Sequence, residues 1–523
     1  MAVDAATMPT VKAASHPNGL YVLAFTELWE RFSFYGLQAL LFLYLTKHFR
    51  LTDARAFEII GSYVALVFML PVIGGLISDR WLGARQAIVF GGVLLAIGHF
   101  GMMFEGAAHL AEITDGQTGI ARDGFALQAL FLSLALVATG VGFLKSNIST
   151  LVGELYARDD PRKDAGFTIF YMGINVGVFL GPLVCGYLGE TYGWRYGFGA
   201  AGVGMLVGLV VFLCGRDLVR ACPSAARRVK ARAWQGQVLS YLVGLVLVAV
   251  AYGLLQAYQF LGYGMLAVGA LVVAGVAVYS LRHCSREQQR KHLAAFVLML
   301  LATVFWSLFA QAGSSLTAMT DRMVDRSVFG FEIKTSQFQS LNAVFILLFG
   351  PLIGGTWRAL ALLGRDPSTV TKFALGLAQG GLAFLVLVVA LATTRPGGMI
   401  NVAWLVATYF LLTTGELCIS PIGLSAMTKL AAPAIAGLMM GAWFMATAGA
   451  GYIGSLIARL TIVAMPAGGQ ADLASSSHAY ASTFLMLFLV AIAVAGGALL
   501  PALTRTLKGA APVSVQTGGH RDA

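Results

Sequence analysis

The feature that most constrains this chain is a succession of long apolar runs, each close to the roughly 20 residues that an α-helix needs to cross a bilayer. Apolar residues make up 58% of the chain and charged residues only 11%, whereas soluble domains carry roughly 25% charged residues. The runs predict an all-α polytopic membrane protein. Its fourteen expected transmembrane helices lie at about 20–47, 55–79, 85–104, 125–152, 165–191, 195–215, 234–253, 260–281, 293–318, 337–362, 370–393, 401–429, 435–463 and 480–508.

The basic residues predict an orientation for these helices. With the N-terminus inside, Lys and Arg are in excess in the inner loops and tails, as the positive-inside rule requires, and the most basic inner loop is 216–235. This distribution accounts for the net charge of +11 without a nucleic-acid partner. The polar first stretch has no apolar signal-peptide region, so the first helix is expected to be retained. We therefore expect a multi-pass protein of the cell inner (plasma) membrane with both termini cytoplasmic.

A weak internal repeat divides the chain. The stretch PVIGG at Pro71–Gly75 recurs as PLIGG at Pro351–Gly355, and two six-helix halves with two inserted helices between them would give that separation. Parallel six-helix repeats are the layout of the major facilitator fold. The expected organisation is a disordered cytoplasmic tail (1–17), an N-terminal six-helix bundle (18–216), a cytoplasmic linker with two inserted transmembrane helices (217–290), a C-terminal six-helix bundle (291–508) and a disordered cytoplasmic tail (509–523). The inserted pair carries almost no charge and is interpreted as lipid-facing packing.

Few ionisable residues lie well inside the predicted helices, where each costs roughly 2.5–3.5 kcal/mol on insertion scales and usually faces a cavity or a transport path. Glu27, Glu30 and Arg31 lie within one turn of the first helix and share roughly one face. Burial favours the protonated form of a carboxylate, and a neighbouring arginine favours the ionised form. Two carboxylates beside one arginine therefore predict a proton switch, in which protonation of a glutamate frees Arg31 to change partners. A static helix-stabilising cluster is the alternative.

Two further charges lie in opposite halves. Lys145 lies in GVGFLKSNIST of the fourth helix, and Glu416 lies in GELCISPIGLSAM of the twelfth. A cavity between the halves would then have a positive group on one wall and a negative group on the other. This arrangement suits a zwitterion with its carboxylate toward Lys145 and its ammonium toward Glu416. The alternative is a direct Lys145–Glu416 bridge that closes a gate and holds no ligand.

These motifs resemble those of a known family. ExxER followed by FSFYG (Glu27–Gly36) and FYMGINVG (Phe170–Gly177) resemble signatures of the proton-dependent oligopeptide transporters, the POT/PTR family of the major facilitator superfamily. The resemblance runs over residues 20–465. It implies a proton-coupled symporter that imports di- and tripeptides by alternating access. It also implies protons as the coupling ion, with no cofactor and no metal.

The resemblance implies two sets of site residues. One set would couple protons: Glu27, Glu30, Arg31 and Lys145. The other set would bind the termini, backbone and side chains of a peptide: Tyr35, Lys145, Tyr171, Asn175, Trp306, Asn342, Glu416, Ser420 and Trp443. Ser420 is included because it lies one helical turn from Glu416. For the aromatic residues, packing or lipid contact is the alternative role.

The chain departs from the family at a pair of positions that many members use as an outer gate. Gln38 stands where a basic residue is common, and Ala310 stands where an acidic residue is common. Losing both charges together avoids leaving one buried charge unpaired, which would be strongly destabilising. Other contacts are then expected to close the outer gate. Candidates are Asp321 and Asp325, with Arg50 or Arg55 as partners.

The residues leave other functions open. The nearest alternative is a proton-coupled carrier of another small solute on the same fold, such as an amino acid, nitrate or a peptide-like compound. A membrane-embedded enzyme is not favoured, because the sequence contains no HExxH, no GxSxG within a helix and no His or Asp cluster for a metal. A channel and a receptor-like sensor have no support in the sequence. We expect a transporter, not an enzyme, that works as a monomer in the lipid bilayer.

Overall fold

The chain is almost entirely helical in the computed structural model, which describes residues 15–106, 108–113, 117–122, 124–157, 160, 162–219, 234–395, 398–463 and 473–500. The predicted tails therefore lie largely outside the described residues. The helices are α1 Asn18–Leu43, α2 Asp53–Ile77, α3 Ala84–Gly101, α4 Gly124–Glu154, α5 Lys163–Tyr192, α6 Trp194–Gly215, α7 Trp234–Gln256, α8 Tyr258–His283, α9 Arg286–Phe309, α10 Ser315–Met323, α11 Ser340–Leu362, α12 Thr369–Thr393, α13 Val402–Leu430, α14 Ala436–Ala458 and α15 Leu473–Ala498.

The predicted set of spans is confirmed within these residues. Thirteen helical segments are long and apolar enough to cross a membrane, and the 26-residue α1 with its three charges is the fourteenth. The ninth span consists of α9 and α10, which are joined by the 3₁₀ turn Ala310–Gly313. In the described part of the chain, short strands lie in the connections: β1 Ala108–Ile113 with β2 Gln117–Arg122, β3 Val324–Asp325 with β6 Ile400–Asn401, and β4 Ser327–Val328 with β5 Phe331–Glu332.

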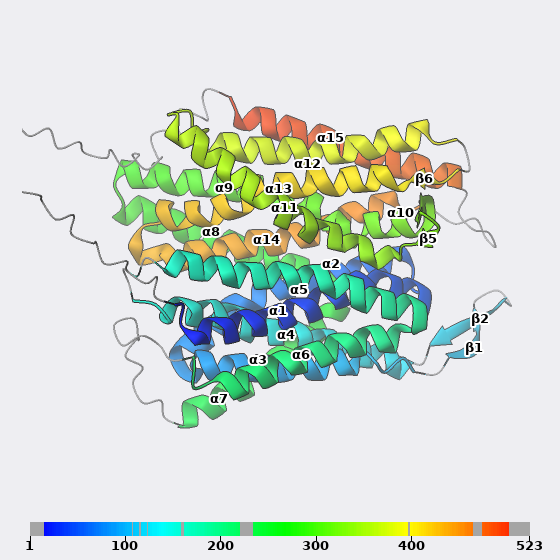
Figure 1. Cartoon of the computed structure of the whole chain (residues 1–523), viewed down its shortest axis with the longest axis horizontal. Helices are drawn as coiled ribbons and strands as arrows, with labels where there is room; N and C mark the ends of the chain where they lie inside the picture. The colour runs from blue at the N-terminus through cyan, green and yellow to red at the C-terminus, as the bar shows by residue number, and fades with distance from the viewer. Residues whose placement is uncertain are drawn as a thin grey trace, which may run out of the picture.

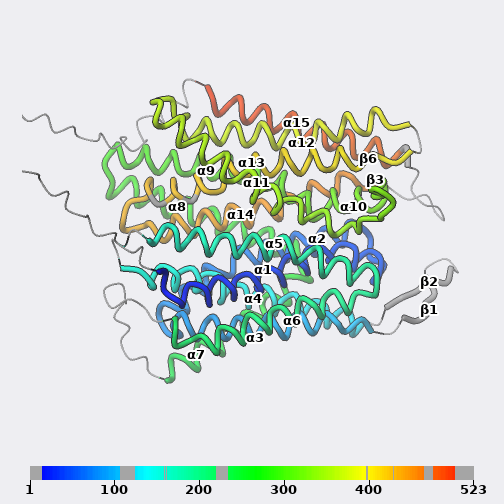
Figure 2. Tube along the Cα trace, in the orientation of Figure 1, coloured from blue at the N-terminus to red at the C-terminus, as the bar shows by residue number. Residues whose placement is uncertain are grey.

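The long helices form two side-by-side groups. In Figure 1, α1 to α6 make up the lower group, and α9 to α15 make up the upper group. We call the end of the bundle at which α1 begins the near end and the opposite end the far end. The near end is on the left, and Figure 2 shows that α15 also ends there. Between the groups, α2 packs against α14 and α5 packs against α11.

Glycines let the helices of the first group approach closely. A Cβ atom on Gly74 of α2 would overlap the backbone carbonyl of Gly142 on α4. A Cβ atom on Gly177 of α5 would overlap the α1 backbone at Leu28 and press on the side chain of Arg31. Without a hydrophobic force between helices in lipid, such close backbone packing is a main source of association. The contact at Gly177 also fixes where α1 presents its charged residues.

The inserted helices connect the two groups. α7 packs on α2 and α4, whereas α8 packs on α14. At the turn between them, the carbonyl oxygen of Gln256 accepts a hydrogen bond from Arg55 Nη2 at 3.2 Å. The hydroxyl of Tyr258 accepts one from Arg459 Nη1 at 3.0 Å. Arg55 lies on α2 and Arg459 directly follows α14, so the tip of the α7–α8 hairpin is bonded to both halves at the far end.

Candidate functional site

The charged cluster of α1 is buried and paired. Arg31 Nε lies 3.2 Å from Glu27 Oε1 and also forms an ion pair with Glu30 Oε2, as the helical spacing predicts. The three side chains are no more than 5% exposed. One oxygen of each carboxylate and Nη2 of Arg31 have no hydrogen-bond partner within the described residues. Buried polar groups are rarely left in this way, so the cluster has capacity for a proton or a further partner.

Lys145 on α4 belongs to the same cluster. Its ammonium lies over the ring of Phe68 on α2, 4.9 Å from the ring centroid, and within electrostatic range of Glu27, Glu30 and Arg31. In the part of the chain that the structure describes, Lys145 forms no direct ion pair. The alternative of a direct Lys145–Glu416 bridge is therefore not formed in this conformation. The cation–π contact instead holds the ammonium beside the α1 cluster.

The opposite charge lies on the second half. Glu416 Oε2 on α13 accepts a hydrogen bond from Asn342 Nδ2 on α11 at 2.8 Å, and the same nitrogen donates to Thr413 Oγ1 at 3.2 Å. Asn342 therefore orients the Glu416 carboxylate. Among the described residues, no cation forms an ion pair with Glu416. A carboxylate in a membrane span without a cationic partner is costly and marks a ligand or ion path.

Two tyrosines lie between the charged groups. Tyr35 on α1 is within electrostatic range of both Arg31 and Glu416, and Tyr171 on α5 is within range of Glu416. The side chain of the buried Asn175 donates a hydrogen bond to the Tyr171 carbonyl at 2.9 Å. The α1 cluster and Glu416 therefore face each other across a space that is lined in part by tyrosine.

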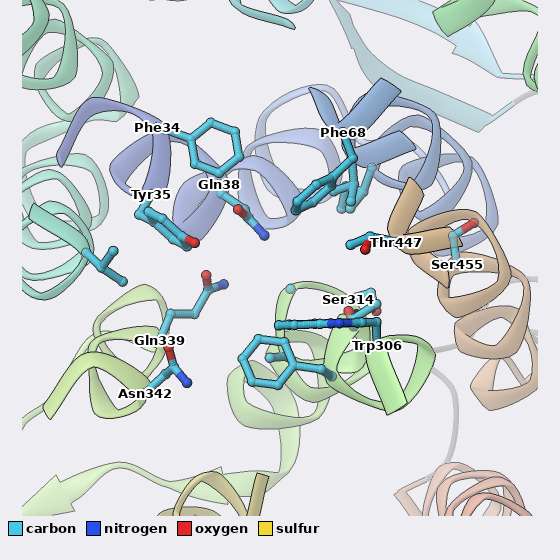
Figure 3. A pocket seen from close by; sticks show the side chains of 18 of the residues that line it. Phe34, Tyr35, Gln38, Phe68, Trp306, Ser314, Gln339, Asn342, Thr447 and Ser455 are labelled. Atoms are coloured by element: carbon cyan, nitrogen blue, oxygen red, sulfur yellow. Dashed lines mark hydrogen bonds between the residues drawn. The ribbon is translucent and has the colours of Figure 1, made fainter. Parts of the chain in front are cut away.

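A cavity of about 130 Å³ lies between the halves, and its lining includes Tyr35 and Asn342 but none of the charged side chains named above. Figure 3 shows side chains from the two halves pointing toward one another across it. Its walls include Phe34, Tyr35, Gln38 and Phe68 from the first half and Trp306, Gln339, Asn342 and Ser455 from the second. Three of the predicted substrate-binding residues thus line one cavity: Tyr35, Trp306 and Asn342.

The remaining predicted substrate residues lie outside the lining of this cavity. Trp443 is 4% exposed and packs on Gly423 of α13 within the core of the second half. Ser420 is half-buried one turn beyond Glu416, and Tyr171 is half-exposed on α5. Their roles in substrate binding remain predictions. Helical spacing alone could not tell whether Trp443 faces the cavity or a neighbouring helix.

Ion pairs join the two halves at the far end. Lys47, just beyond α1, lies 2.5 Å from Asp321 of α10. The two terminal nitrogens of Arg322 donate to the carboxylate of Asp53, at the start of α2, at 2.6 and 2.7 Å. Both pairs connect the loop after α1 with the end of the ninth span. Bidentate arginine–carboxylate pairs are among the more geometrically specific ion pairs.

The predicted gate residues Asp321 and Asp325 therefore have partners other than those predicted. Asp321 pairs with Lys47, whereas Asp325 accepts a hydrogen bond from the backbone of Ser327 in its own loop at 3.0 Å. The two arginines proposed as partners do not contact either aspartate: Arg55 pairs with Glu58, and Arg50 is exposed. Lys47, Asp53 and Arg322 were missed in the sequence analysis. The sequence feature that could have identified them is that these oppositely charged residues lie at ends of predicted spans on the same side of the membrane.

Further polar contacts close the far end on both sides of these pairs. Glu190 Oε1, near the end of α5, accepts hydrogen bonds from the backbone N–H and the hydroxyl of Ser336 at 2.9 and 2.5 Å. Glu58 Oε1 lies 3.1 Å from Arg459 Nη1. Between α2 and α14, a Cβ atom on Gly61 would overlap the Ser455 side chain. The cavity is thus covered at the far end by contacts from four helix pairs.

The part of α11 that extends toward the near end is little covered. Leu348 and Leu352 on α11 are 58% and 62% exposed. A Cβ atom on Gly354 would meet no other atom within 4 Å. The polar contacts between the halves described above therefore lie at the far end.

Comparison with known proteins identifies the family. Residues 85–473 match the sequence profile of the POT family (PTR2). The chain belongs to the POT family. The resemblance seen in the sequence motifs is thereby confirmed, and the protein is a multi-pass membrane transporter of the major facilitator fold.

Individual POT relatives match over most of the chain. The chain is 35% identical over 458 residues to the uncharacterized transporter YclF of Bacillus subtilis, covering 85% of this chain and 88% of that protein. It is 34% identical to the peptide transporter YePEPT of Yersinia enterocolitica, covering 85% and 87%. It is 34% identical to dipeptide and tripeptide permease A of Salmonella typhimurium, covering 87% and 86%.

A solved structure has the same fold. It is a crystal structure of a POT peptide transporter, a glutamate-to-glutamine mutant in complex with sulfate. The two chains are 32% identical, with a TM-score of 0.79, and the match covers 97% of this chain and 99% of the other.

Proposed function

We propose that this POT-family protein is a proton-coupled symporter that imports di- and tripeptides by alternating access. The observation that carries the proposal is the charge arrangement around the cavity. Arg31 and Lys145 lie behind the lining residues Phe34 and Phe68 of the first half. The unpaired carboxylate of Glu416 lies behind the lining residue Asn342 of the second half. A peptide zwitterion matches both charges at once. Relatives named as peptide transporters support the same substrate class.

Substrate binding follows from this charge arrangement. The peptide carboxylate approaches Lys145, and the ammonium approaches Glu416, which Asn342 holds in place. Aromatic walls such as Tyr35 and Trp306 accept varied side chains, because a flat apolar surface makes contact without a directional requirement. Fixed polar groups for the termini with apolar walls between them suit a carrier that accepts many sequences.

Proton coupling follows from the unsatisfied atoms of the α1 cluster. Arg31 shares its Nε between Glu27 and Glu30, and each carboxylate keeps one free oxygen. A proton on either carboxylate weakens its hold on Arg31. The guanidinium can then turn toward the substrate carboxylate or toward the second half. Since coupled carboxylates titrate as a pair, the proton is assigned to the pair. The proton is the proposed coupling ion.

The far-end ion pairs support an assignment of this conformation. With the N-terminus in the cytoplasm, the near end faces the cytoplasm and the far end faces outward. The present structure is then closed to the outside. We place the transporter in the plasma membrane and expect it to work as a monomer. The other half of the cycle requires the contacts of Asp53, Asp321 and Glu190 to break.

Uptake of labelled dialanine by purified protein in liposomes tests the proposal. With an imposed inward proton gradient, the wild type is expected to concentrate the peptide. The Glu30→Gln variant is expected to lose gradient-driven uptake and to keep exchange of dialanine across the membrane. The reason is that a permanently neutral side chain leaves Arg31 free but cannot carry a proton. The measurements are uptake with and without a gradient and counterflow at a fixed pH.

Glu287→Gln provides the matched control, because Glu287 is an exposed carboxylate at the near end of α9, and among the described residues its ion-pair partner is Lys291 of the same helix. It is expected to behave as the wild type. If Glu27→Gln and Glu30→Gln both still concentrate dialanine under a gradient, the switch is wrong. If the wild type moves no di- or tripeptide under any gradient, the peptide assignment is wrong and the substrate is to be sought among amino acids, nitrate and peptide-like compounds.

Charge reversal at the far end tests the closing contacts. The variants Asp53→Arg and Arg322→Asp each place like charges where a bidentate pair now lies. Exposed pairs contribute about 0.2–1 kcal/mol, so each single variant is expected to slow uptake by about two- to fivefold. The double variant, which restores an opposite pair, is expected to recover most of the loss. Initial rates of dialanine uptake measure both effects.

Glu332→Arg is the control for these reversals. Glu332 pairs with Arg326 at 3.1 Å, and both residues belong to the same far-end loop of the second half. The Glu332→Arg variant therefore changes the charge at the far end without altering a contact between the two halves. A double Asp53→Arg/Arg322→Asp variant that is slower than both single variants would contradict a role for this pair in closing the far end.

A further inference from the structure

The lining of the cavity between the halves contains no charged side chain among the described residues. Among the described residues that line the cavity, none is Asp, Glu, Lys, Arg or His. The charged groups lie at its borders, where Arg31 approaches the ring of Phe34 and Lys145 approaches the ring of Phe68. Beyond these rings, Gln38 and Ala310 occupy the two positions at which the sequence analysis noted a missing pair of charges, and both line the cavity.

Two side-chain amides face this uncharged space from opposite halves. Figure 3 shows Gln38 of α1 and Gln339, the residue before α11, reaching into the cavity. Within the described part of the chain, the Gln38 amide makes no hydrogen bond. The Gln339 amide makes one long bond, from its nitrogen to Thr317 Oγ1 at 3.4 Å. Each amide therefore retains donor and acceptor capacity for a ligand.

Three aliphatic hydroxyl groups in the lining donate their hydrogen to backbone carbonyls. Ser314 donates to the Ala310 carbonyl at 3.0 Å, and Ser455 donates to the Tyr452 carbonyl at 2.7 Å. Thr447 donates to the carbonyl of Trp443 one turn earlier on α14, at 3.2 Å. Their donors are satisfied by their own helices. The two glutamine amides therefore offer hydrogen-bonding capacity to a ligand in the cavity, beside the polar atoms of Tyr35, Trp306 and Asn342 that also line it.

Aromatic rings complete the walls. Trp306 and Phe309 form an edge-to-face pair with centroids 5.3 Å apart, and Phe34 and Tyr35 form another at 5.1 Å. All four residues line the cavity. Flat apolar walls around two neutral amides make a site that holds an uncharged group and provides no counter-charge for an ion.

We propose that this cavity is a subsite for an uncharged peptide side chain, with amide side chains held by Gln38 and Gln339. The proposal rests on the proposed peptide transport and specifies the side chains of the substrate. A carboxylate or ammonium placed here loses its hydration without gaining an ion pair. A side-chain amide instead exchanges its hydrogen bonds with water for bonds to the two glutamines. The subsite therefore selects against acidic and basic side chains.

Competition against labelled dialanine uptake tests the subsite. The competitors are the dipeptides of alanine with glutamine, glutamate or lysine, each in both sequence orders. In at least one order, the glutamine peptide is expected to inhibit at concentrations about tenfold below those needed for the glutamate and lysine peptides, because an unpaired buried charge is strongly disfavoured. The expected ranking is the same if the glutamine peptide inhibits equally well in both sequence orders.

The Gln38→Glu variant is expected to reverse the ranking of the two charged competitors and to favour the lysine peptide about tenfold over the glutamate peptide. Gln339→Glu, which changes the amide contributed by the second half, is a second variant, and it is also expected to favour the lysine peptide over the glutamate peptide. Gln128→Glu is the matched control. Gln128 lies at the far end on α4, where its side chain bonds Tyr252 of α7 at 2.5 Å and does not line the cavity. It is expected to leave the ranking unchanged.

Equal inhibition by the three peptides, with dialanine uptake intact, would overturn the subsite and leave the proposed function standing. An unchanged ranking in both Gln38→Glu and Gln339→Glu would also overturn it. Absence of dialanine uptake by the wild type would overturn the proposed function and the subsite with it. The wild-type ranking needs no variant to fold, so the proposal can fail on that measurement alone.

Discussion

Arg31→Gln is expected to abolish both gradient-driven uptake and exchange of dialanine, and to destabilise the protein. Arg31 is the only side chain that pairs with Glu27 and Glu30 among the described residues. Removing one partner of a buried ion pair typically costs about 3–5 kcal/mol, because the other charge is left without compensation. Here two carboxylates would be left, with Lys145 as the nearest remaining cation. Liposome uptake and thermal unfolding in detergent measure the two losses.

Arg31→Lys distinguishes charge from geometry. A lysine keeps the positive charge but presents a compact ammonium in place of the planar guanidinium that reaches both carboxylates. It is expected to recover most of the thermal stability and little of the transport. If Arg31→Gln exchanges dialanine at the wild-type rate, the α1 cluster has only the static, helix-stabilising role given as the alternative in the sequence analysis. Reduced unfolding temperature alone, with transport intact, would lead to the same conclusion.

Glu416→Gln is expected to weaken the apparent affinity for dialanine by about ten- to a hundredfold, which corresponds to the loss of a charge-assisted hydrogen bond of about 1.5–3 kcal/mol. Glutamine has nearly the same shape and can keep the contact with Asn342. The change therefore removes the negative charge that faces the peptide ammonium while preserving the wall of the cavity. Concentration dependence of initial uptake rates gives the affinity.

N-acetyl-dialanine serves as the matched substrate for this variant, because it lacks the ammonium group. The wild type is expected to bind it poorly, and Glu416→Gln is expected to narrow the difference between the two substrates. Such a cycle isolates the interaction between the carboxylate and the ammonium from other effects of either change. An equal loss for both substrates would assign Glu416 a structural role and contradict its contact with the peptide.

Much of the fold could be predicted from sequence because the bilayer imposes a length and an apolar composition on each span. The ends of spans were less predictable. The ninth span was expected at 293–318, whereas α9 begins at Arg286, where Ser285 caps the helix by accepting from the Gln288 backbone. Its other part extends to Met323 after a 3₁₀ turn. Helix caps and turns depend on local hydrogen bonds, which average hydropathy does not detect.

The contacts of the candidate site were also predictable only in part. Contacts within one helix follow from spacing, so the pairing of Arg31 with Glu27 and Glu30 was predictable. Contacts between helices distant in sequence were not, and neither Lys47–Asp321 nor Asp53–Arg322 was foreseen. Such pairs depend on which loops meet when the two halves pack. The same limit applies to Trp443, since its burial against α13 depends on the rotation of α14 about its axis.

The tip of the α7–α8 hairpin is bonded to Arg55 and to Arg459, so a change in the tilt of the hairpin would act on both halves. The two helices have 23 and 26 residues, or about 35 and 39 Å at 1.5 Å per residue. Their outward faces are apolar and exposed, as at Leu245 and Leu266. A bilayer of different thickness tilts such helices. Tilting would move the tip and pull on both halves at the seam, so that lipid composition becomes an input to the rate of gate opening.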